Sequence, residues 1–282
     1  MKNTTLIGLI ILFLVDLIAF SFFIELQPKN LTVSFFDVGQ GDCILIETPQ
    51  NHQIIIDGGP KSDVALQKIY SNIPWWDKTI DLVILTHPES DHLRGLFSIL
   101  DNYQVENIAW TGVDNGDEIR DQWEKIIYNE GANVATINKG DKIIASDIVL
   151  DILGPQEDLR DKEVKETNDT SVVAKLLFKD VSFLFPGDIS SKIEKTLINE
   201  NIDVDVLKIP HHGSKYSTSE IFLEKTSPLM AIIQVGKNTY GHPTEEVLTR
   251  LSNSGIKILR NDINGDVKIV SDGKNYKIIT NK

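Results

Sequence analysis

The first apolar stretch of the chain runs from Leu6 to Ile24 and is interrupted only by Asp16 and Ser21. Its length is close to the roughly 20 residues that an α-helix needs to cross a bilayer. Because Lys2 precedes it, the positive-inside rule predicts a cytoplasmic N-terminus and an extracytoplasmic remainder. A cleaved signal peptide, which would give a secreted protein, and a buried core helix are the alternatives. The pattern favours an uncleaved, single-pass membrane anchor.

The pattern changes after the turn-forming segment 27–30, which completes an N-terminal unit of residues 1–30. Short β-rich runs come first, and strands then alternate with helical stretches. We expect strands at 31–38, 43–48, 53–59, 80–86, 105–110, 148–153, 171–178, 181–185, 204–209, 231–235, 265–270 and 276–280. We expect helices at 93–100, 118–129, from 189 to about 199, and from 219 and 245, with an exposed charged loop at 154–168. This order is typical of one α/β domain, residues 31–282, with two packed sheets and helices on their outer faces.

Composition narrows the chemistry that such a domain can perform. The formal net charge of -13 argues against a bulk electrostatic grip on nucleic acid, although bound metal ions can still recruit phosphate. A single cysteine, Cys43, excludes an internal disulfide and a cysteine-based zinc cluster, and no disulfide-linked partner is expected. Metal ligands would therefore have to be histidine and carboxylate.

The segment HPESDH follows the apolar strand 80–86 and offers four potential ligands within six residues, namely His87, Glu89, Asp91 and His92. Loops at strand ends are where α/β proteins place ligands. Imidazole and carboxylate together suit a first-row divalent ion. The alternative is a helix cap with two unrelated histidines, but two of only six histidines fall in this segment.

Three further histidines follow other strands: His211 and His212 come after 204–209, and His242 comes after 231–235. Asp188 ends another strand, where a lone aspartate would more often cap a helix. The histidine clusters favour a metal ligand instead. The sixth histidine, His52, lies in a polar turn and is expected to be solvated. Three lysines near these motifs are candidates for phosphate contacts or are simply solvated: Lys208, Lys215 and Lys237.

The motifs FDVGQGDCILIE, IIIDGG, LTHPESDHLRGL, NDTSVVAKLLF, FLFPGDI, LKIPHHGS and YGHP resemble the hydrolase domain of the ComEC/Rec2 competence proteins, within the metallo-β-lactamase superfamily. The likeness runs from about Leu31 to the C-terminus. Because the chain has one apolar segment rather than a multi-helix channel, it looks like a free-standing, membrane-anchored relative.

The resemblance implies an αββα sandwich with two divalent metal ions between the sheets. His87 and Glu89 would bind the first ion, Asp91 and His92 the second, and Asp188 would bridge them. Which of the remaining three histidines completes the second site stays open: His211, His212 and His242. The resemblance also implies that Asn168 or Asp169 replaces a histidine ligand, that Asp57 orients a ligand, and that Asp42 is a weaker candidate at the rim.

One position departs from the pattern, because the superfamily has His and competence proteins usually have Asp where this chain has Glu89. Replacing nitrogen by oxygen hardens the first site and favours Mn²⁺, with Zn²⁺ the other candidate. The resemblance implies that the two ions activate a shared water to attack phosphorus, in chemistry centred on Asp91, Asp188 and His212. Extracellular DNA is the implied substrate. The alternatives are a surface phosphodiesterase acting on cell-wall polymers or small esters, and a metal-free binding module.

Overall fold

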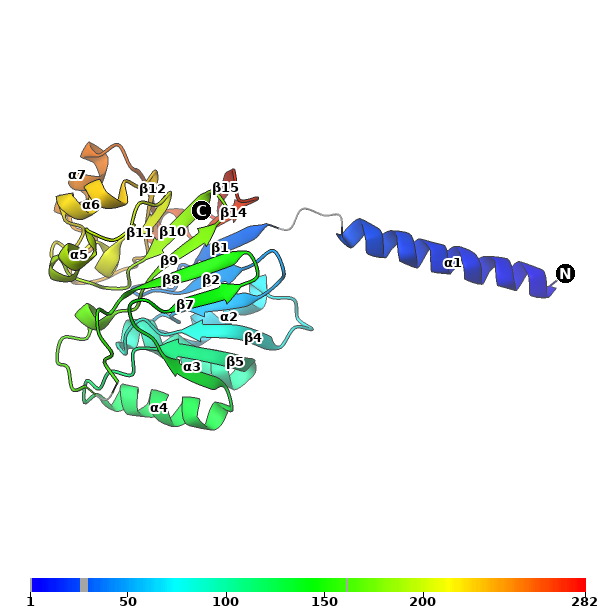
Figure 1. Cartoon of the computed structure of the whole chain (residues 1–282), viewed down its shortest axis with the longest axis horizontal. Coiled ribbons are helices and arrows are strands. Elements are labelled where there is room, and N and C mark those ends of the chain that lie inside the picture. The colour runs from blue at the N-terminus through cyan, green and yellow to red at the C-terminus, as the bar shows by residue number, and fades with distance from the viewer. Residues whose placement is uncertain (1, 26–29, 161) are drawn as a thin grey trace.

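Two β-sheets packed face to face form the centre of the computed structural model, which describes residues 2–25, 30–160 and 162–282 (Figure 1). The first sheet has the order β15-β14-β1-β2-β3-β4-β5-β6. Its strands are β1 Leu31–Phe35, β2 Ile44–Glu47, β3 Gln53–Ile56, β4 Thr79–Ile84, β5 Gln104–Trp110, β6 Asn133–Thr136, β14 Val267–Ser271 and β15 Tyr276–Thr280. The second sheet has the order β13-β12-β11-β10-β9-β8-β7. Its strands are β7 Lys142–Ala145, β8 Ile148–Gly154, β9 Val173–Phe178, β10 Val181–Phe185, β11 Val206–Lys208, β12 Met230–Ile233 and β13 Lys257–Arg260.

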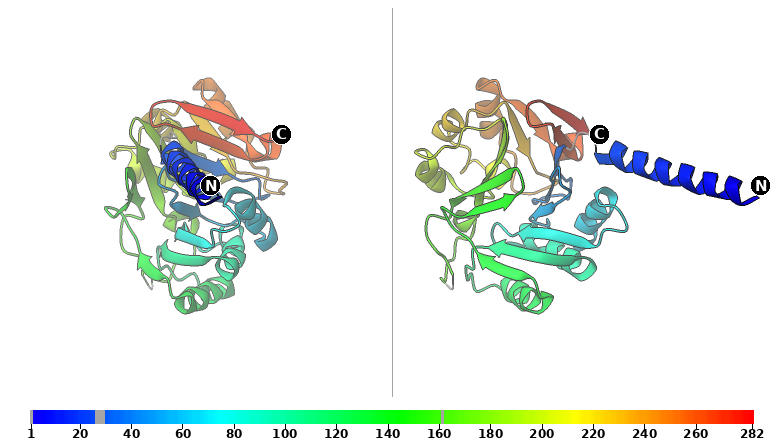
Figure 2. Two further views of the ribbon diagram at one scale, coloured as in Figure 1. Left: turned by 90° about the vertical axis from the view of Figure 1, so that its right-hand side faces the viewer. Right: turned by 45° about the vertical axis from the view of Figure 1, so that its right-hand side comes forward.

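Both sheets are mixed, with a parallel half and an antiparallel half. Strands β3 to β6 run parallel, as do β10 to β13, and the remaining neighbours pair antiparallel. Parallel neighbours need crossover connections, which the helices supply. The helices of the domain are α2 Ser62–Asn72, α3 Ser90–Asn102, α4 Glu118–Glu130, α5 Ser191–Leu197, α6 Glu220–Thr226, α7 Glu245–Asn253 and α8 Asn261–Asn264. Figure 2 shows the C-terminal strands beside β1, where β14 pairs antiparallel with it.

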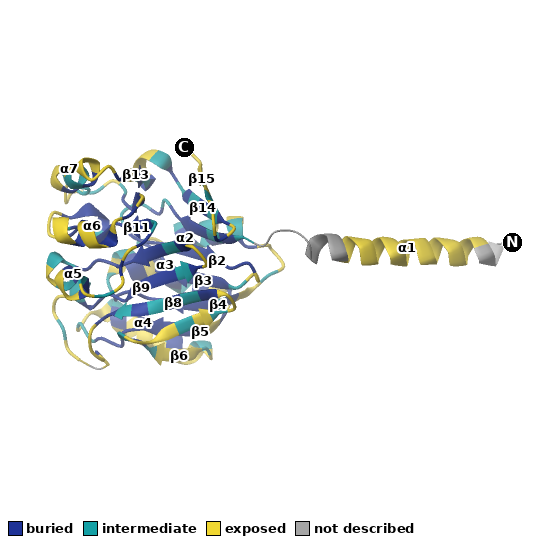
Figure 3. Cartoon of the chain, turned by 45° about the horizontal axis from the view of Figure 1, so that its top comes forward, coloured by how far each residue is buried: buried dark blue, intermediate teal, exposed yellow. Residues whose placement is uncertain are grey.

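Three apolar layers hold the domain together, and Figure 3 shows the buried residues concentrated in the sheets. Strand β3 explains why the central strands are apolar throughout: Ile54 and Ile56 face the second sheet, whereas Ile55 faces the helices. Helices α2, α3 and α4 cover the first sheet, and α5, α6 and α7 cover the second. The expected α/β sandwich of two mixed sheets with outer helices is confirmed.

Among the strands and α-helices, five elements were not expected from the sequence: α2, β6, β7, β13 and α8. Helix α2 buries only Ala65 and Ile69, so its sequence carries almost no apolar stripe. Strands β6 and β7 lie at the edges of their sheets and are partly exposed, which removes the apolar run that marks a central strand. The loop 154–168 is only partly exposed, because Leu159 and Thr167 are buried against the domain.

The N-terminal helix α1 spans Lys2–Glu25, and its described side chains, residues 5–21, are all exposed (Figure 3). Among the described residues, no helix combines the length and the apolar character that crossing a bilayer requires. Residues 27–29 of the expected linker lie outside the described residues.

Candidate metal centre

The ends of strands from both sheets bring histidine and carboxylate side chains together at one edge of the sandwich. The segment after β4 supplies His87 and His92, the segment after β10 supplies Asp188, and the segment after β11 supplies His212. One ligand atom from each of His87, His92 and Asp188 lies within 4.8 Å of the other two. Asp91, His92 and His212 form a second group by the same measure. Residues more than 100 positions apart thus share one buried site.

Two of the histidines have their Nδ1 atoms held by hydrogen bonds. His92 Nδ1 lies 2.8 Å from Oδ2 of Asp57, and His212 Nδ1 lies 2.8 Å from the backbone oxygen of Gln234. Because both partners are acceptors, each Nδ1 carries a proton, and Nε2 is the ring nitrogen left to face a metal ion. This arrangement orients an imidazole for metal binding.

His87 follows the same rule through a hydroxyl. Thr86 donates its hydroxyl proton to Oδ2 of Asp57 over 2.7 Å, so its oxygen can accept from Nδ1 of His87, 3.0 Å away. The Nε2 atoms of His87, His92 and His212 are all buried, and none has a hydrogen-bond partner among the described residues. Three buried imidazole nitrogens that lack a hydrogen-bond partner among the described residues and gather around a carboxylate fit a divalent metal ion.

Asp188 is the carboxylate on which these imidazoles converge. Its Oδ2 atom lies 3.4 Å from Nε2 of His92 and 3.3 Å from Nε2 of His212. Its Oδ1 atom instead accepts a hydrogen bond from the ammonium of Lys208, over 3.1 Å. Lys208 is itself buried, and it also pairs with Asp42 and donates to the backbone oxygen of Gly187. Lys208 therefore orients Asp188 from the buried side of the cluster, and it is neither solvated nor free to contact a substrate.

The electrostatics of the cluster set His87 apart from the other two histidines. Burial alone would lower the pKa of His92 and of His212, but Asp188 and its neighbouring carboxylates outweigh burial and raise both pKa values well above the usual value. Burial, together with the neighbouring His92, lowers the pKa of His87 to about 3. Burial alone would raise the pKa of Asp188, but His212, Lys208 and His92 outweigh it and hold that pKa well below its usual range. His87 is thus available as a neutral ligand, and Asp188 as an anionic one.

Asp42 lies deeper than the sequence indicated. It was expected at the rim, but it is buried, with Oδ1 at 3.4 Å from Nδ1 of His212 and Oδ2 paired with Lys208. The turn before it still reaches the cavity, because Gln40 is among the lining residues. Asp42 therefore contacts His212 and Lys208 on the buried side of the cluster.

Besides His211 and His242, three candidate ligands lie outside the two groups just described: Glu89, Asn168 and Asp169. Glu89 accepts a hydrogen bond from the hydroxyl of Thr167, and Asp169 accepts one from the backbone amide of Ser190 over 3.0 Å. The Oδ1 atom of Asn168 is buried without a hydrogen-bond partner among the described residues. Glu89 nevertheless reaches the cavity, whereas the Asp169 carboxylate is occupied by the turn that begins α5.

The cluster lies at the base of a cavity of about 370 Å³, lined by Gln40, Glu89, Ser90, Asp91, Asp188, His211, His212, Tyr240 and His242. Asp91 faces it, with Oδ2 3.5 Å from Nε2 of His212. His211 and His242 form its wall, with ring centroids 5.4 Å apart. Burial lowers the pKa of both, and that of His242 falls to about 4. Both histidines line the cavity, and neither belongs to a metal-binding group among the described residues.

Local backbone geometry explains how these ligands are aimed. Asp57 has a φ of 58°, and His211 and His212 have φ of 51° and 52°, in the left-handed region that costs energy for non-glycine residues. Gly58 and Gly95 let the turn after β3 contact the start of α3 directly, because a Cβ on Gly95 would overlap the backbone of Gly58. That contact places Asp57 beside His92.

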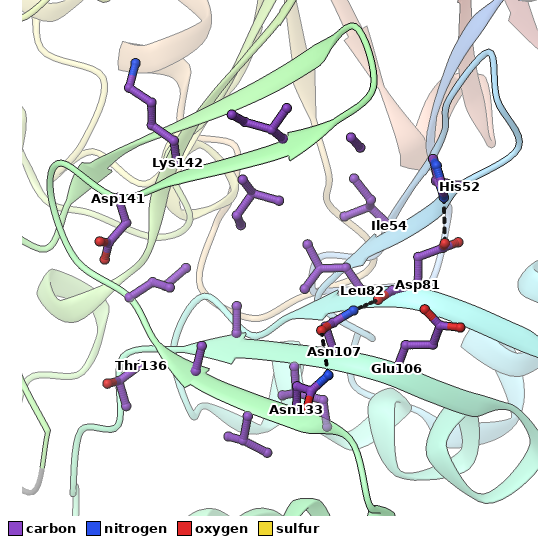
Figure 4. Close-up of a pocket in the computed structure, with 18 of the residues that line it drawn as sticks. His52, Ile54, Asp81, Leu82, Glu106, Asn107, Asn133, Thr136, Asp141 and Lys142 are labelled. Atoms are coloured by element: carbon purple, nitrogen blue, oxygen red, sulfur yellow. Dashed lines mark hydrogen bonds and ion pairs between the residues drawn. The ribbon is translucent and has the colours of Figure 1, made fainter.

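A larger cavity, about 680 Å³, lies away from the cluster, between the edge strands of the two sheets (Figure 4). His52 is at its margin, and its Nδ1 atom lies 2.6 Å from Oδ1 of Asp81. His52 is therefore paired, not merely solvated as expected, and it joins no metal-binding group among the described residues. Asn107 and Asn133 extend the polar margin through a hydrogen bond of 3.3 Å.

Comparison with known proteins agrees with this geometry. The sequence profile described as the metallo-beta-lactamase superfamily matches residues 36–236. The chain belongs to this superfamily. With its buried cluster of histidine and aspartate, it is a metal-dependent hydrolase of the metallo-β-lactamase fold.

The relatives include proteins of bacterial competence. The chain is 30% identical to ComE operon protein 3 of Bacillus subtilis over 265 residues, which is 84% of this chain and 32% of that protein. It is 28% identical to competence protein ComA of Neisseria gonorrhoeae over 253 residues, 86% of this chain and 32% of that protein. The chain thus spans about a third of the length of these curated relatives.

Solved structures share the fold. The metallo-β-lactamase fold protein YhfI from Bacillus subtilis superposes with a TM-score of 0.59 at 12% identity, covering 86% of this chain and 100% of that chain. CmlA, a diiron β-hydroxylase from Streptomyces venezuelae, gives a TM-score of 0.55 at 12% identity, covering 90% of this chain and 55% of that chain. At these identities the likeness establishes the architecture alone.

Proposed function

We propose that the chain hydrolyses phosphodiester bonds of extracellular DNA with the help of two divalent metal ions. The observation that carries this proposal is the convergence of three unpartnered Nε2 atoms, from His87, His92 and His212, on Asp188. The likeness to proteins named for competence supports DNA as the substrate. The motifs that resemble the ComEC/Rec2 hydrolase domain are part of the same sequence likeness.

Two of the three groups of ligand atoms among the described residues suggest ion positions, since in the third group (Asp42, Asp57 and His92) the side chains of Asp57 and His92 are hydrogen-bonded to each other. His87, His92 and Asp188 would hold an ion on one side, and Asp91 with His212 would hold an ion on the other. Asp188 would serve both, since its Oδ2 atom lies between His92 and His212 while Lys208 retains Oδ1. When bound, such ions supply Lewis-acid chemistry: they lower the pKa of water and offset charge on phosphate oxygens. Mn²⁺ is proposed because Glu89, which faces the cavity, offers a hard oxygen donor.

The protein's own side chains would then orient the substrate. His211 and His242 face the cavity beside Asp91 and are the groups placed to contact a phosphate ester or its leaving oxygen. Tyr240 stacks on His242 with ring centroids 5.8 Å apart, which gives a flat surface suited to a base or a sugar.

A surface phosphodiesterase acting on cell-wall polymers or small esters is the second candidate, and one observation favours it. None of the nine residues that line the cavity is lysine or arginine, and the chain carries a formal net charge of -13. A polyanion such as DNA gains little from that surface away from the ions. The metal-free binding module is set aside, since the chain is a metal-dependent hydrolase.

We further propose that residues 1–30 attach the protein to the cytoplasmic membrane, with the hydrolase domain outside, or are cleaved to release it. The apolar run Leu6–Ile24 and the preceding Lys2 support this placement. The described side chains of α1, residues 5–21, are all exposed, which leaves its apolar surface available to a membrane.

The decisive experiment loads the full-length chain with Mn²⁺ and compares hydrolysis of single-stranded DNA with hydrolysis of bis(4-nitrophenyl) phosphate. Cleavage of both by the unaltered chain and of neither by His87→Ala is expected. His52→Ala is the matched control, because His52 is paired with Asp81 far from the cluster. Cleavage of the small diester alone would favour the second candidate, and cleavage of neither at full metal occupancy would overturn phosphodiester chemistry.

A further inference from the structure

Two tryptophans, Trp75 and Trp76, stand exposed in the loop 73–78 that precedes β4. Their exposed fractions are 80% and 69%, whereas the other two tryptophans, Trp110 and Trp123, are buried. Tryptophan combines a large apolar ring with a polar N–H group, and adjacent exposed pairs are costly in water. Such side chains are characteristic of sites that meet the interface between lipid and water.

The loop that carries them is rigidly held. Ile73 is buried, and Asp77 N–H donates to the backbone oxygen of Pro74 over 2.9 Å. The Asp77 carboxylate accepts hydrogen bonds from Thr79 and from the side chain of Gln53, the latter over 2.9 Å. The loop is therefore tied to β3 and β4, and the two rings project from a fixed support, 5.7 Å apart between centroids. Little conformational entropy would be lost when these rings bind.

The second observation is the position of this loop relative to the start of β1, where the chain enters the domain. Thr32 of β1 lies opposite Glu47, and Glu47 lies opposite Gln53. One residue further, Ile54 of β3 lies beside Leu82 of β4. The N-terminal ends of β1 and β4 thus lie at the same end of the sheet, where strands begin or end, three strand spacings or about 14 Å apart. Figure 1 shows the cyan loop before β4 projecting on the side where β1 begins.

The metal centre lies at the opposite edge. His87 follows the C-terminal end of β4, roughly 20 Å along the strand from the tryptophan loop. The edge with the tryptophans also carries Lys78, whose ammonium lies 5.0 Å from the ring centroid of Tyr70 and 5.3 Å from that of Tyr103. A lysine beside interfacial aromatic rings can meet a lipid phosphate while the rings enter the headgroup layer.

We propose that the loop 73–78 is a second membrane contact, which docks this edge of the domain on the lipid surface and turns the metal centre away from it. The partner is the headgroup region of a bilayer. The inference rests on the proposed attachment through residues 1–30, because that segment leaves the domain at the same edge. Its consequence is that substrate reaches the site from the aqueous phase rather than along the membrane.

The test uses the full-length chain on phosphatidylglycerol/phosphatidylethanolamine vesicles, with and without lipids brominated on their acyl chains. The expected result is co-flotation with the vesicles and quenching of tryptophan emission by the brominated lipid. Trp75→Phe/Trp76→Phe should still float but lose this quenching, because Trp110 and Trp123 are buried. In that background Tyr216→Trp places a reporter at the metal-centre edge, and it should remain unquenched.

The outcomes separate the two proposals. A chain that does not float overturns membrane attachment and, with it, the docking. A chain that floats while Trp75 and Trp76 stay unquenched overturns the docking alone, as does equal quenching of the Tyr216→Trp reporter. A shift of tryptophan emission with protein concentration in the absence of lipid, accompanied by dimer formation, would assign the loop to a contact between two copies and would also overturn the proposal.

Discussion

The Nδ1 atom of His92 lies 2.8 Å from Oδ2 of Asp57, and both side chains are completely buried. Asp57 also accepts from the amide and the hydroxyl of Thr86, so its two oxygens are fully used. The carboxylate is thus the common support of His92 and, through Thr86, of His87. Two candidate ligands from one segment depend on a single acidic side chain from the preceding strand end.

Replacing this support gives the first prediction. In the native protein three donors, the amide and hydroxyl of Thr86 and Nδ1 of His92, bind the two oxygens of Asp57. Asp57→Asn leaves only one acceptor oxygen, so His92 should lose its fixed orientation. Loss of such a supporting group typically weakens metal binding by about 10–100-fold. Competition against a chromophoric chelator measures the affinity. Asp81→Asn is the matched control, since it alters the Asp81–His52 pair away from the cluster and should leave affinity unchanged. Equal affinities in both variants would contradict the role given to Asp57.

A second prediction concerns Asp188. Asp188→Asn should reduce kcat/KM more than any single histidine substitution, because the carboxylate lies between His92 and His212 and would serve both ions. A loss above about 100-fold is expected, since that is the upper range for removing only a supporting group. Steady-state assays at saturating Mn²⁺ measure it. An inactive His92→Ala beside a fully active Asp188→Asn would show that the bridging role is misassigned.

The third prediction tests the contact that brings α3 to the site. Gly95→Ala adds a Cβ that would overlap the backbone of Gly58, and backbone cannot yield as a flexible side chain can. Overpacking of this kind costs about 1–3 kcal/mol in the free energy of unfolding. Urea denaturation measures the change, with Ser98→Ala on the same helix as the control. If Gly95→Ala and Ser98→Ala prove equally stable, the close approach is not required.

Metal preference provides a fourth prediction. Glu89 faces the cavity as an oxygen donor, so activity after chelation should return better with Mn²⁺ than with Zn²⁺. Glu89→His should shift the preference toward Zn²⁺. Activity recovery across a series of metal concentrations measures both. Thr167→Val is a useful companion, because it removes the hydrogen bond to Glu89 without changing the ligand type. A preference of the unaltered chain for Zn²⁺ would show that ligand hardness does not govern this site.

The sequence allowed much of the architecture to be predicted, because the central strands are strongly apolar and are separated by clear turn residues. The elements that escaped prediction are those whose stability comes from tertiary contacts. Helix α2 has only Ala65 and Ile69 to bury, and the edge strands β6 and β7 pair on one side only. Their local sequences therefore lack the period that reveals buried elements.

The sequence allowed the strand ends that carry the site to be predicted, but not the directions or the hydrogen-bond partners of the side chains on them. Nothing in the sequence distinguishes His212, which points at Asp188, from His211, which points into the cavity, because the choice depends on two left-handed backbone conformations. The buried pair of Lys208 and Asp42 also escaped prediction, since a lysine beside a histidine motif suggests a substrate contact. The backbone oxygen of Gln234 that holds His212 leaves no signal in side-chain chemistry.

The last prediction concerns the placement of the hydrolase domain and rests on the first thirty residues. Under the proposed attachment, the run Leu6–Ile24, whose length approaches the roughly 20 residues of a membrane span, would lie in the bilayer, and Lys2 would hold its N-terminus inside. Residues from about 31 onward should therefore face the exterior. Protease added to intact protoplasts should digest the domain while a cytoplasmic marker protein survives, and the undigested chain should sediment with membranes. Protection of the domain would indicate the inverted topology and would remove extracellular DNA as the substrate. Release of a shortened chain into the medium would instead identify a cleaved signal, and because the metal ligands all lie beyond residue 31, that result would leave the proposed chemistry intact.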